Sequence, residues 1–258
     1  MAKAKPEVLE EAGTDVVNWE EKLAGDAKVI AAQERPPVSK ISFKSGVMTY
    51  MGITMPNNEL DCIAIAYSYE NVLYTKAYDP DVIHPPGCFA ISLPQNAGSI
   101  GENMVPHEVV PEKQNGDCQS CPQMEWGSGK GRGRACSVRR RIAVIPADAL
   151  KDLDNIAKAE IAVISLPVMS VQNWAKYVNL VSAQYSRPYW AVITKVKLKP
   201  DPKTQFKVYF DTIGQLPQDA LGPIHGAIEA GERVVLEPYN METGKFGDKE
   251  ETADSDKF

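Results

Sequence analysis

Residues 189–210, YWAVITKVKLKPDPKTQFKVYF, decide the fold because two alternating stretches flank a proline-rich turn. Alternation of apolar and polar residues is typical of a half-buried β-strand. We therefore expect an antiparallel hairpin in which residues 189–199 pair with residues 205–210 across the turn KPDPKT. One face of this hairpin carries Trp190, Val192, Val196, Leu198, Phe206, Val208 and Phe210, and the other carries Tyr189, Lys195, Lys197, Lys199, Lys207 and Tyr209.

Further short strands and helices are expected on both sides of the hairpin. Residues 38–78, 140–145 and 161–168 are rich in β-branched and aromatic residues, as strands are. Ser170 is expected to cap a helix with Val171, Trp174, Val178 and Val181 on one face, and residues 217–230 predict a last helix. Together these elements predict an α+β protein, an OB-like antiparallel β-barrel with helical decorations.

Composition divides the chain into three parts. We expect an N-terminal helical arm at residues 1–37, the OB-like core at residues 38–240 and a disordered acidic tail at residues 241–258. Within the core, residues 79–141 are dominated by Pro, Gly, Asn and other polar residues. A loop of that length is uncommon in a compact domain unless something else organises it, so a metal-stabilised insertion is expected there.

The cysteines supply the ligands for such a metal. Cys118 and Cys121 have the two-residue gap with which both thiolates reach one ion, and Cys136 follows after fourteen residues. The fourth ligand is either Cys88, which we prefer, or His107. Cys62 lies in a strand pattern and is expected in the core. The expected cofactor is therefore one structural Zn²⁺ ion.

A basic segment lies next to these cysteines. Lys130, Arg132, Arg134, Arg139, Arg140 and Arg141 fall within twelve residues that contain no acid. Glycines alternate with the first of them, and Trp126 offers a face on which a base can stack. We interpret the loop as a nucleic-acid-binding finger, with a solvated charged loop as the alternative. The lysines and tyrosines of the hairpin suit the same ligand, although edge-strand lysines also protect against aggregation.

Charge and hydropathy restrict the function further. The net charge of −6 argues against attraction of the whole molecule to a polyanion, so any such binding must be local. No stretch approaches the roughly 18 apolar residues of a membrane span, and the start lacks the apolar segment of a signal peptide. We therefore expect a cytoplasmic protein without a membrane partner.

The last twelve residues, GDKEETADSDKF, hold five acids and two lysines and end in Phe258. An acidic tail with an aromatic tip resembles the tails of bacterial and phage single-stranded DNA-binding proteins. That resemblance implies that Asp254, Asp256 and Phe258 contact replication proteins such as a polymerase, helicase or primase. A plain solubilising terminus is the alternative.

A set of motifs extends the resemblance over most of residues 38–230. The set comprises Tyr78-Asp79-Pro80, Pro85-Pro86-Gly87-Cys88-Phe89-Ala90, Pro106-His107-Glu108, Asp117-Cys118-Gln119-Ser120-Cys121-Pro122, Trp126-Gly127-Ser128, Gly133-Arg134-Ala135-Cys136 and Arg140-Arg141. It resembles tailed-phage proteins associated with single-stranded DNA binding. Some phage helix-destabilising proteins combine an OB-type core, a zinc subdomain and an acidic tail. The resemblance implies zinc ligation by Cys88, or His107 in its place, together with Cys118, Cys121 and Cys136.

We therefore predict a non-enzymatic protein that binds single-stranded DNA without sequence preference in phage DNA replication or recombination. It would act in the cytoplasm of the infected bacterial host, and homo-oligomers are compatible with this role.

Two other classes of function stay open. A virion structural protein would use zinc only to order the loop, and a zinc-dependent nucleic-acid enzyme would need an open coordination position with Glu125 to handle protons.

Overall fold

The computed structural model describes Trp19, Lys22, Leu23, Gly25 and residues 39–76, 82–97 and 103–245. The chain divides into two units, Met1–Pro36 and Pro37–Phe258. The four described residues of the first unit are helical, and the Lys22 ammonium lies 5.2 Å from the centre of the Trp19 ring. The rest of the predicted N-terminal arm, and the predicted tail from residue 246 onward, lie outside the described residues.

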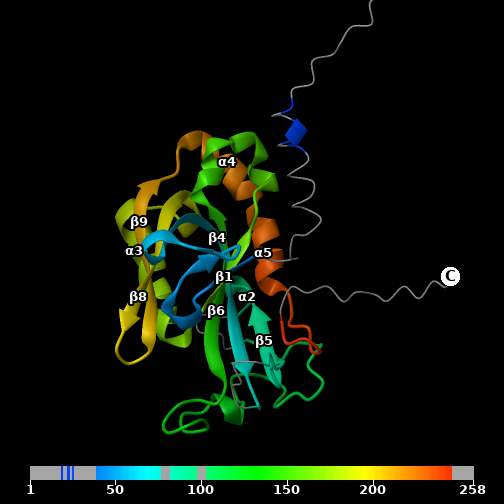
Figure 1. The fold of residues 1–258 in the computed structure, drawn as a ribbon. Helices are drawn as coiled ribbons and strands as arrows, with labels where there is room; N and C mark the ends of the chain where they lie inside the picture. The colour runs from blue at the N-terminus through cyan, green and yellow to red at the C-terminus, as the bar shows by residue number, and fades with distance from the viewer. Residues whose placement is uncertain are drawn as a thin grey trace, which may run out of the picture. The chain divides into compact units, whose positions relative to one another are not determined.

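Within the described part of the second unit, nine strands form one mixed sheet (Figure 1). The strands are β1 (Ser39–Ser42), β2 (Thr49–Tyr50), β3 (Ile53–Thr54), β4 (Glu59–Leu73), β5 (Cys88–Ser92), β6 (Ser137–Pro146), β7 (Ala162–Leu166), β8 (Val192–Asp201) and β9 (Gln205–Gln215). Their order is β3-β2-β1-β7-β6-β4-β8-β9, and β5 pairs with the second half of β4. The predicted hairpin is present as β8 and β9.

One strand pair departs from the predicted antiparallel arrangement. β1 and β7 run parallel, with Ser39 opposite Ala162. Parallel neighbours need a long crossover connection, and the chain between β1 and β7, which contains β2 to β6, supplies it. The prediction of a purely antiparallel sheet is therefore wrong at this pair, whose partners are too far apart in the sequence for local patterns to reveal.

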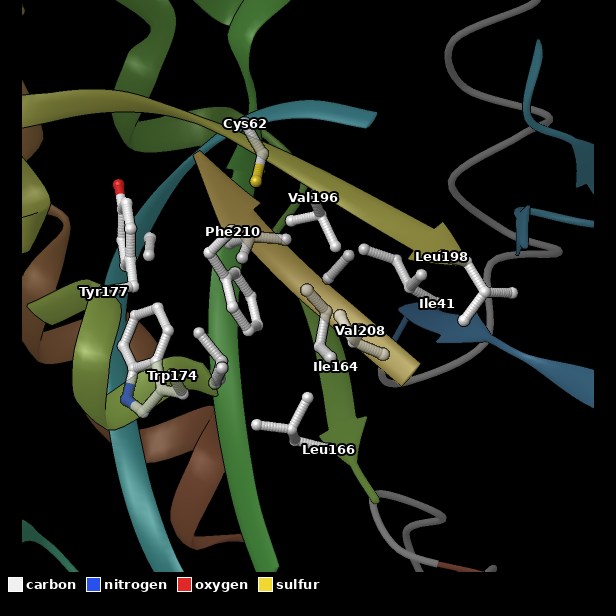
Figure 2. Packing of buried hydrophobic residues seen from close by; sticks show 14 of the residues in the cluster. Ile41, Cys62, Ile164, Leu166, Trp174, Tyr177, Val196, Leu198, Val208 and Phe210 are labelled. Carbon is white, nitrogen blue, oxygen red and sulfur yellow. The ribbon is translucent and has the colours of Figure 1, made fainter. Parts of the chain in front are cut away.

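The sheet curls into a half-barrel. The register between β4 and β6 shifts between Ala64 and Ala66, and such irregularities bend strands. The curvature brings Phe43, which follows β1, close to Phe206 of β9, with ring centres 6.2 Å apart. Ile41 of β1 shares one buried core with Leu198 of β8 (Figure 2). The α+β class and the barrel-like curvature are thus confirmed.

Helices cover both faces of the sheet. On one face, α3 (Val171–Tyr185) buries Trp174, Tyr177 and Val181 against β8 and β9, in the core that Figure 2 shows. On the other face, α4 (Gln218–Gly226) and α5 (Ile228–Leu236) pack against a separate core from β4 and β6. Among the described residues, no helix has the length and apolar composition needed to cross a membrane. A short helix, α2 (Pro94–Ala97), follows β5.

The last helix differs from its predicted form. The sequence predicts one helix over residues 217–230, whereas the chain turns at Ala227 and continues as α5 to Leu236. The turn lays Gly231 directly on β4, where an added Cβ would lie 2.7 Å from Ile65 Cδ1. Tertiary packing against β4 therefore decides the direction of this segment.

Ser170 precedes α3 as predicted but does not cap it. Its hydroxyl accepts a hydrogen bond from the Val208 N–H of β9 at 3.0 Å, and no side-chain cap bond is formed. Asn173 donates to the Val208 carbonyl at 2.8 Å. These two bonds satisfy the backbone of β9 at its outer edge and fix α3 to the strand.

Candidate metal centre and nucleic-acid surface

Four cysteines lie together at the end of β4. Cys88 begins β5 opposite Leu73, and Cys136 immediately precedes β6. Cys118 and Cys121 approach from the loop between these strands. All four side chains are buried and line one cavity of about 20 Å³. That volume accommodates a particle about the size of one water molecule.

The donor set is one that zinc accepts. Four thiols, two of them separated by two residues, make the ligand set of closed structural zinc sites. Among the described residues, however, no three His, Cys, Asp or Glu side chains already have the spacing of a bound metal. The four cysteines nevertheless line one cavity, and a rotamer change is enough to redirect a thiol sulfur toward an ion in it.

Two thiols of this cavity, Cys118 and Cys136, have raised pKa values. Burial raises the pKa of Cys118 to about 11, with the neighbouring Cys88 and Cys121 adding to the rise. Burial likewise raises the pKa of Cys136 to about 12, again with a contribution from the other cysteines. A cation that binds here must displace the thiol protons, so its affinity increases with pH.

The turn that carries Cys118 and Cys121 is fixed by its own side chains. Asp117 accepts hydrogen bonds from the Ser120 N–H at 2.7 Å and from the Ser120 hydroxyl at 2.6 Å. These bonds lower the pKa of Asp117. The Cys118 N–H donates to the Met104 carbonyl at 2.9 Å. The two thiols are therefore held on one short turn.

His107 and Glu125 are not among the residues that line the cavity. The His107 ring stacks on Phe89 with ring centres 5.2 Å apart, and its Nδ1 accepts a hydrogen bond from the Val109 N–H at 3.3 Å. Glu125 is exposed. The structure thus brings Cys88, rather than His107, to the other three cysteines.

Residues 122–135, which we call the basic finger, form the loop just before the start of β6 (Figure 1). The Ser128 hydroxyl lies 2.7 Å from the Glu125 carbonyl and accepts a hydrogen bond from the Ala135 N–H at 3.0 Å. The Gly127 and Gly129 N–H groups both donate to the Gly133 carbonyl at 3.0 Å. These hydrogen bonds join the two sides of the finger.

Two glycines have a steric role in the finger. A Cβ at Gly129 would lie 2.7 Å from the carbonyl carbon of Arg134, closer than backbone atoms tolerate. Gly131 has φ +64°, a conformation that strains most other residues. The glycine pattern that suggested close approach to phosphates is thus also required by the path of the loop.

The basic finger presents charge and an aromatic ring to solvent. The Trp126 side chain is 75% exposed, and the Arg134 guanidinium lies 4.6 Å from its ring centre. Lys130 and Arg132 are exposed as well. Within the described residues, Lys130, Arg132 and Arg134 form no ion pair. Their charge can therefore act on a ligand.

The three arginines of β6 lie in different environments because successive strand residues point to opposite faces. The Arg140 guanidinium stacks 3.5 Å from the centre of the Tyr69 ring. The Arg139 guanidinium lies 5.6 Å from the centre of the Tyr74 ring. Both side chains are half-buried.

Arg141 is fully buried and ion-paired. Its Nε and NH2 lie 2.7 and 2.6 Å from Glu70 Oε1, and its NH1 donates to the Glu237 carbonyl. The Tyr239 hydroxyl donates to the same Glu70 oxygen at 2.9 Å. The prediction that Arg141 contacts nucleic acid is wrong, because a side chain with 0% exposure cannot reach a ligand.

The outer face of β8 and β9 carries acids between its lysines. Lys195 lies 2.9 Å from Asp61, and Lys197 lies 2.9 Å from Asp211. Glu59 approaches both lysines, and Lys207 lies 2.8 Å from Asp201. Lys199 lies 5.3 Å from the ring centre of Tyr209. The predicted inward Val192, Val196 and Leu198 are buried as expected, but the outer face is charge-balanced rather than basic.

Tyr189 does not lie on that outer face. It begins the 3₁₀ turn Tyr189–Ala191, where strand alternation does not apply. Its ring packs edge-on against Tyr67 and Trp174, with centres 5.5 and 5.6 Å apart. The prediction that Tyr189 projects with the lysines is therefore wrong. Trp190 likewise lies outside the strand and packs on the opposite core.

Tyr67 and Tyr69 of β4 belong to the same aromatic group and were not predicted as site residues. Their ring centres lie 6.2 Å apart, and both side chains are half-buried. The spacing Tyr67-Ser68-Tyr69 places both rings on one strand face, and this is the signal from which they could have been found.

The predicted partner-binding residues Asp254, Asp256 and Phe258 lie outside the described residues. Comparisons of the chain with protein-family models, with curated proteins and with solved structures found no match.

Proposed function

We propose that this protein binds single-stranded DNA without sequence preference, through the basic finger on an OB-like half-barrel. The observation that carries the proposal is the exposed surface of the finger. An exposed Trp126 lies against the Arg134 guanidinium, the same loop carries exposed Lys130 and Arg132, and none of the three cations has an acidic partner among the described residues. Cations along the backbone with aromatic rings for the bases are the combination by which proteins hold single strands.

Zinc has a structural role in this proposal. Cys88, Cys118, Cys121 and Cys136 would hold the ion, which supplies a closed cross-link between β5, β6 and the intervening loop. Cys121 and Cys136 flank the finger directly. Fixing both ends of the finger lowers the entropy that its cations lose when they bind a polyanion.

The finer role rests on the motif set and the acidic tail, which resemble those of tailed-phage proteins. We propose a non-enzymatic function in phage DNA replication or recombination, in the cytoplasm of the infected bacterium. Asp254, Asp256 and Phe258 would recruit replication proteins. The paired lysines of β8 and β9 are left out of the binding surface because carboxylates already hold them.

A salt-dependent titration tests the proposal. Fluorescence polarisation of labelled oligo-dT and of a matched duplex would be measured at two ionic strengths. We expect tighter binding of the single strand. The triple variant Lys130→Ala, Arg132→Ala, Arg134→Ala should reduce the slope of log affinity against log salt by about 2, because each phosphate contact on a single strand contributes about 0.7.

The matched control removes three exposed lysines elsewhere, Lys44→Ala, Lys151→Ala and Lys176→Ala, and thus changes the net charge equally. Its salt slope should stay close to that of the unaltered protein. Equal slopes for the two triple variants would contradict the finger assignment. A virion structural protein would show no dependence of affinity on oligonucleotide length, so the same titration repeated with a shorter and a longer oligo-dT separates that alternative.

A further inference from the structure

A second surface combines aromatic rings with arginines. It consists of Tyr67, Tyr69 and Arg140 on one face of β4 and β6, with Tyr189 and Arg187 from the segment after α3, and we call it the tyrosine strip. Tyr67 contacts both of the other tyrosines: its ring centre lies 6.2 Å from that of Tyr69 and 5.5 Å from that of Tyr189. All five side chains are half-buried, so each one retains some exposed surface.

An arginine lies at each end of the strip. Arg140 stacks on Tyr69 and donates to the Arg139 carbonyl, and its side chain is half-buried, so part of it stays exposed. At the other end, Arg187 and Tyr189 line a hollow of about 550 Å³ together with Val178, Ser182, Ser186 and Pro188. Within the described residues neither arginine has a carboxylate partner. Two half-buried cations without counterions are suited to an anionic ligand.

The rings between the arginines favour one kind of anion. Bases that are unpaired stack on aromatic rings and on guanidinium planes, whereas a duplex keeps its base faces inside. The Tyr67 ring meets Tyr189 edge-on and lies tilted against Tyr69, so each ring offers its own exposed part to a base.

The strip also adjoins the cysteine site. Tyr69 packs against the buried cluster that contains Ala90, Met104 and Cys118. Asn71, two residues along the same face of β4, lines the cysteine cavity. The same loop that carries the basic finger thus supports one end of the strip.

We propose that the tyrosine strip is a second subsite for single-stranded DNA, in which bases stack on Arg140 and on the rings of Tyr67 and Tyr189 while Arg187 contacts phosphate. This inference rests on the proposed function and deepens it. The finger supplies attraction to the backbone and one stacking ring, and the strip adds stacking for further unpaired bases.

The test compares oligo-dT with an oligonucleotide of equal length in which the central positions are abasic, both titrated by fluorescence polarisation. Loss of a stacked base should weaken binding by the unaltered protein about tenfold. In the double variant Tyr69→Leu, Arg140→Gln this preference should fall well below tenfold, because the Arg140 platform is lost while Tyr67, Tyr189 and Trp126 remain. The finger triple variant should weaken both alike and preserve the ratio.

The matched control is Tyr50→Leu with Lys44→Gln, which also removes one tyrosine and one positive charge from the half-barrel, and it should preserve the tenfold ratio. A second measurement needs no variant. Ultraviolet cross-linking of 5-iodouracil-substituted oligo-dT to the unaltered protein should give adducts at Tyr67, Tyr69 or Tyr189 by mass spectrometry.

An unchanged ratio in the double variant, or adducts confined to the basic finger, would overturn the second subsite while leaving the proposed function in place. Absence of oligonucleotide binding by the unaltered protein would overturn both.

Discussion

Arg140 and Arg141 are neighbours in the sequence and have opposite surroundings. Arg140 stacks on Tyr69 with part of its surface exposed, while Arg141 is enclosed with Glu70 and Tyr239. Alternation along β6 separates the two side chains, because a strand turns successive residues to opposite faces. Arg141 therefore serves the stability of the protein, whereas Arg140 remains available to a ligand.

Arg141→Ala should lower the free energy of unfolding by about 3–5 kcal/mol, because it leaves the Glu70 carboxylate buried without its partner. Urea denaturation followed by circular dichroism measures this. The control Arg139→Ala removes a cation–π contact between a half-buried guanidinium and the Tyr74 ring and should cost about 1–2 kcal/mol. Equal losses for the two variants would show that the Glu70–Arg141 pair does not stabilise the fold.

Single residues also show which properties a sequence can predict. The inward positions of Val192, Val196 and Leu198 follow from alternation, which is a local property. The partner of Arg141 could not be predicted, since Glu70 lies 71 positions away and the two meet only through the register of β4 with β6. The acids opposite Lys195 and Lys197 depend on register in the same way.

At the scale of elements, the cysteine site depends on the meeting of β4, β5 and β6. Cys88 lies opposite Leu73 on one side, and Cys136 precedes β6 on the other. The loop then brings Cys118 and Cys121 over the same end of β4. The spacing of the last three cysteines predicted a shared ion, but only strand pairing shows why Cys88 joins them and His107 does not.

Cys88→Ser should lower the zinc content of the purified protein from about one ion per chain to a small fraction, because structural zinc sites need four ligands. His107→Asn should leave the metal content unchanged, since His107 does not line the cavity. Inductively coupled plasma mass spectrometry measures both. Loss of zinc in His107→Asn, with retention in Cys88→Ser, would assign the fourth ligand to the histidine instead.

Elements with a strong local pattern were predicted well. The β8–β9 hairpin, β7 and α3 all lie close to their expected positions. The parallel pairing of β1 with β7 and the break between α4 and α5 were not predicted. Both depend on contacts between residues distant in the sequence, which periodicity does not reveal.

For the whole molecule, the distribution of charge matters more than its sum. The chain carries a net charge of −6, and acids balance Lys195, Lys197 and Lys207 on the outer face of the sheet. The cations of the basic finger have no such partners among the described residues. The proposed binding of a polyanion would therefore be local, at the basic finger and the adjoining tyrosine strip.

The central claim is that one zinc ion, held by four cysteines, orders the surface that binds single strands. The most direct measurement is the affinity for labelled oligo-dT at fixed salt, before and after a chelator removes the metal, and again after zinc is restored. We expect removal to weaken binding at least about tenfold, or about 1.4 kcal/mol, and one equivalent of zinc to restore it. Affinity that stays the same after the metal is removed would show that zinc does not order the binding surface.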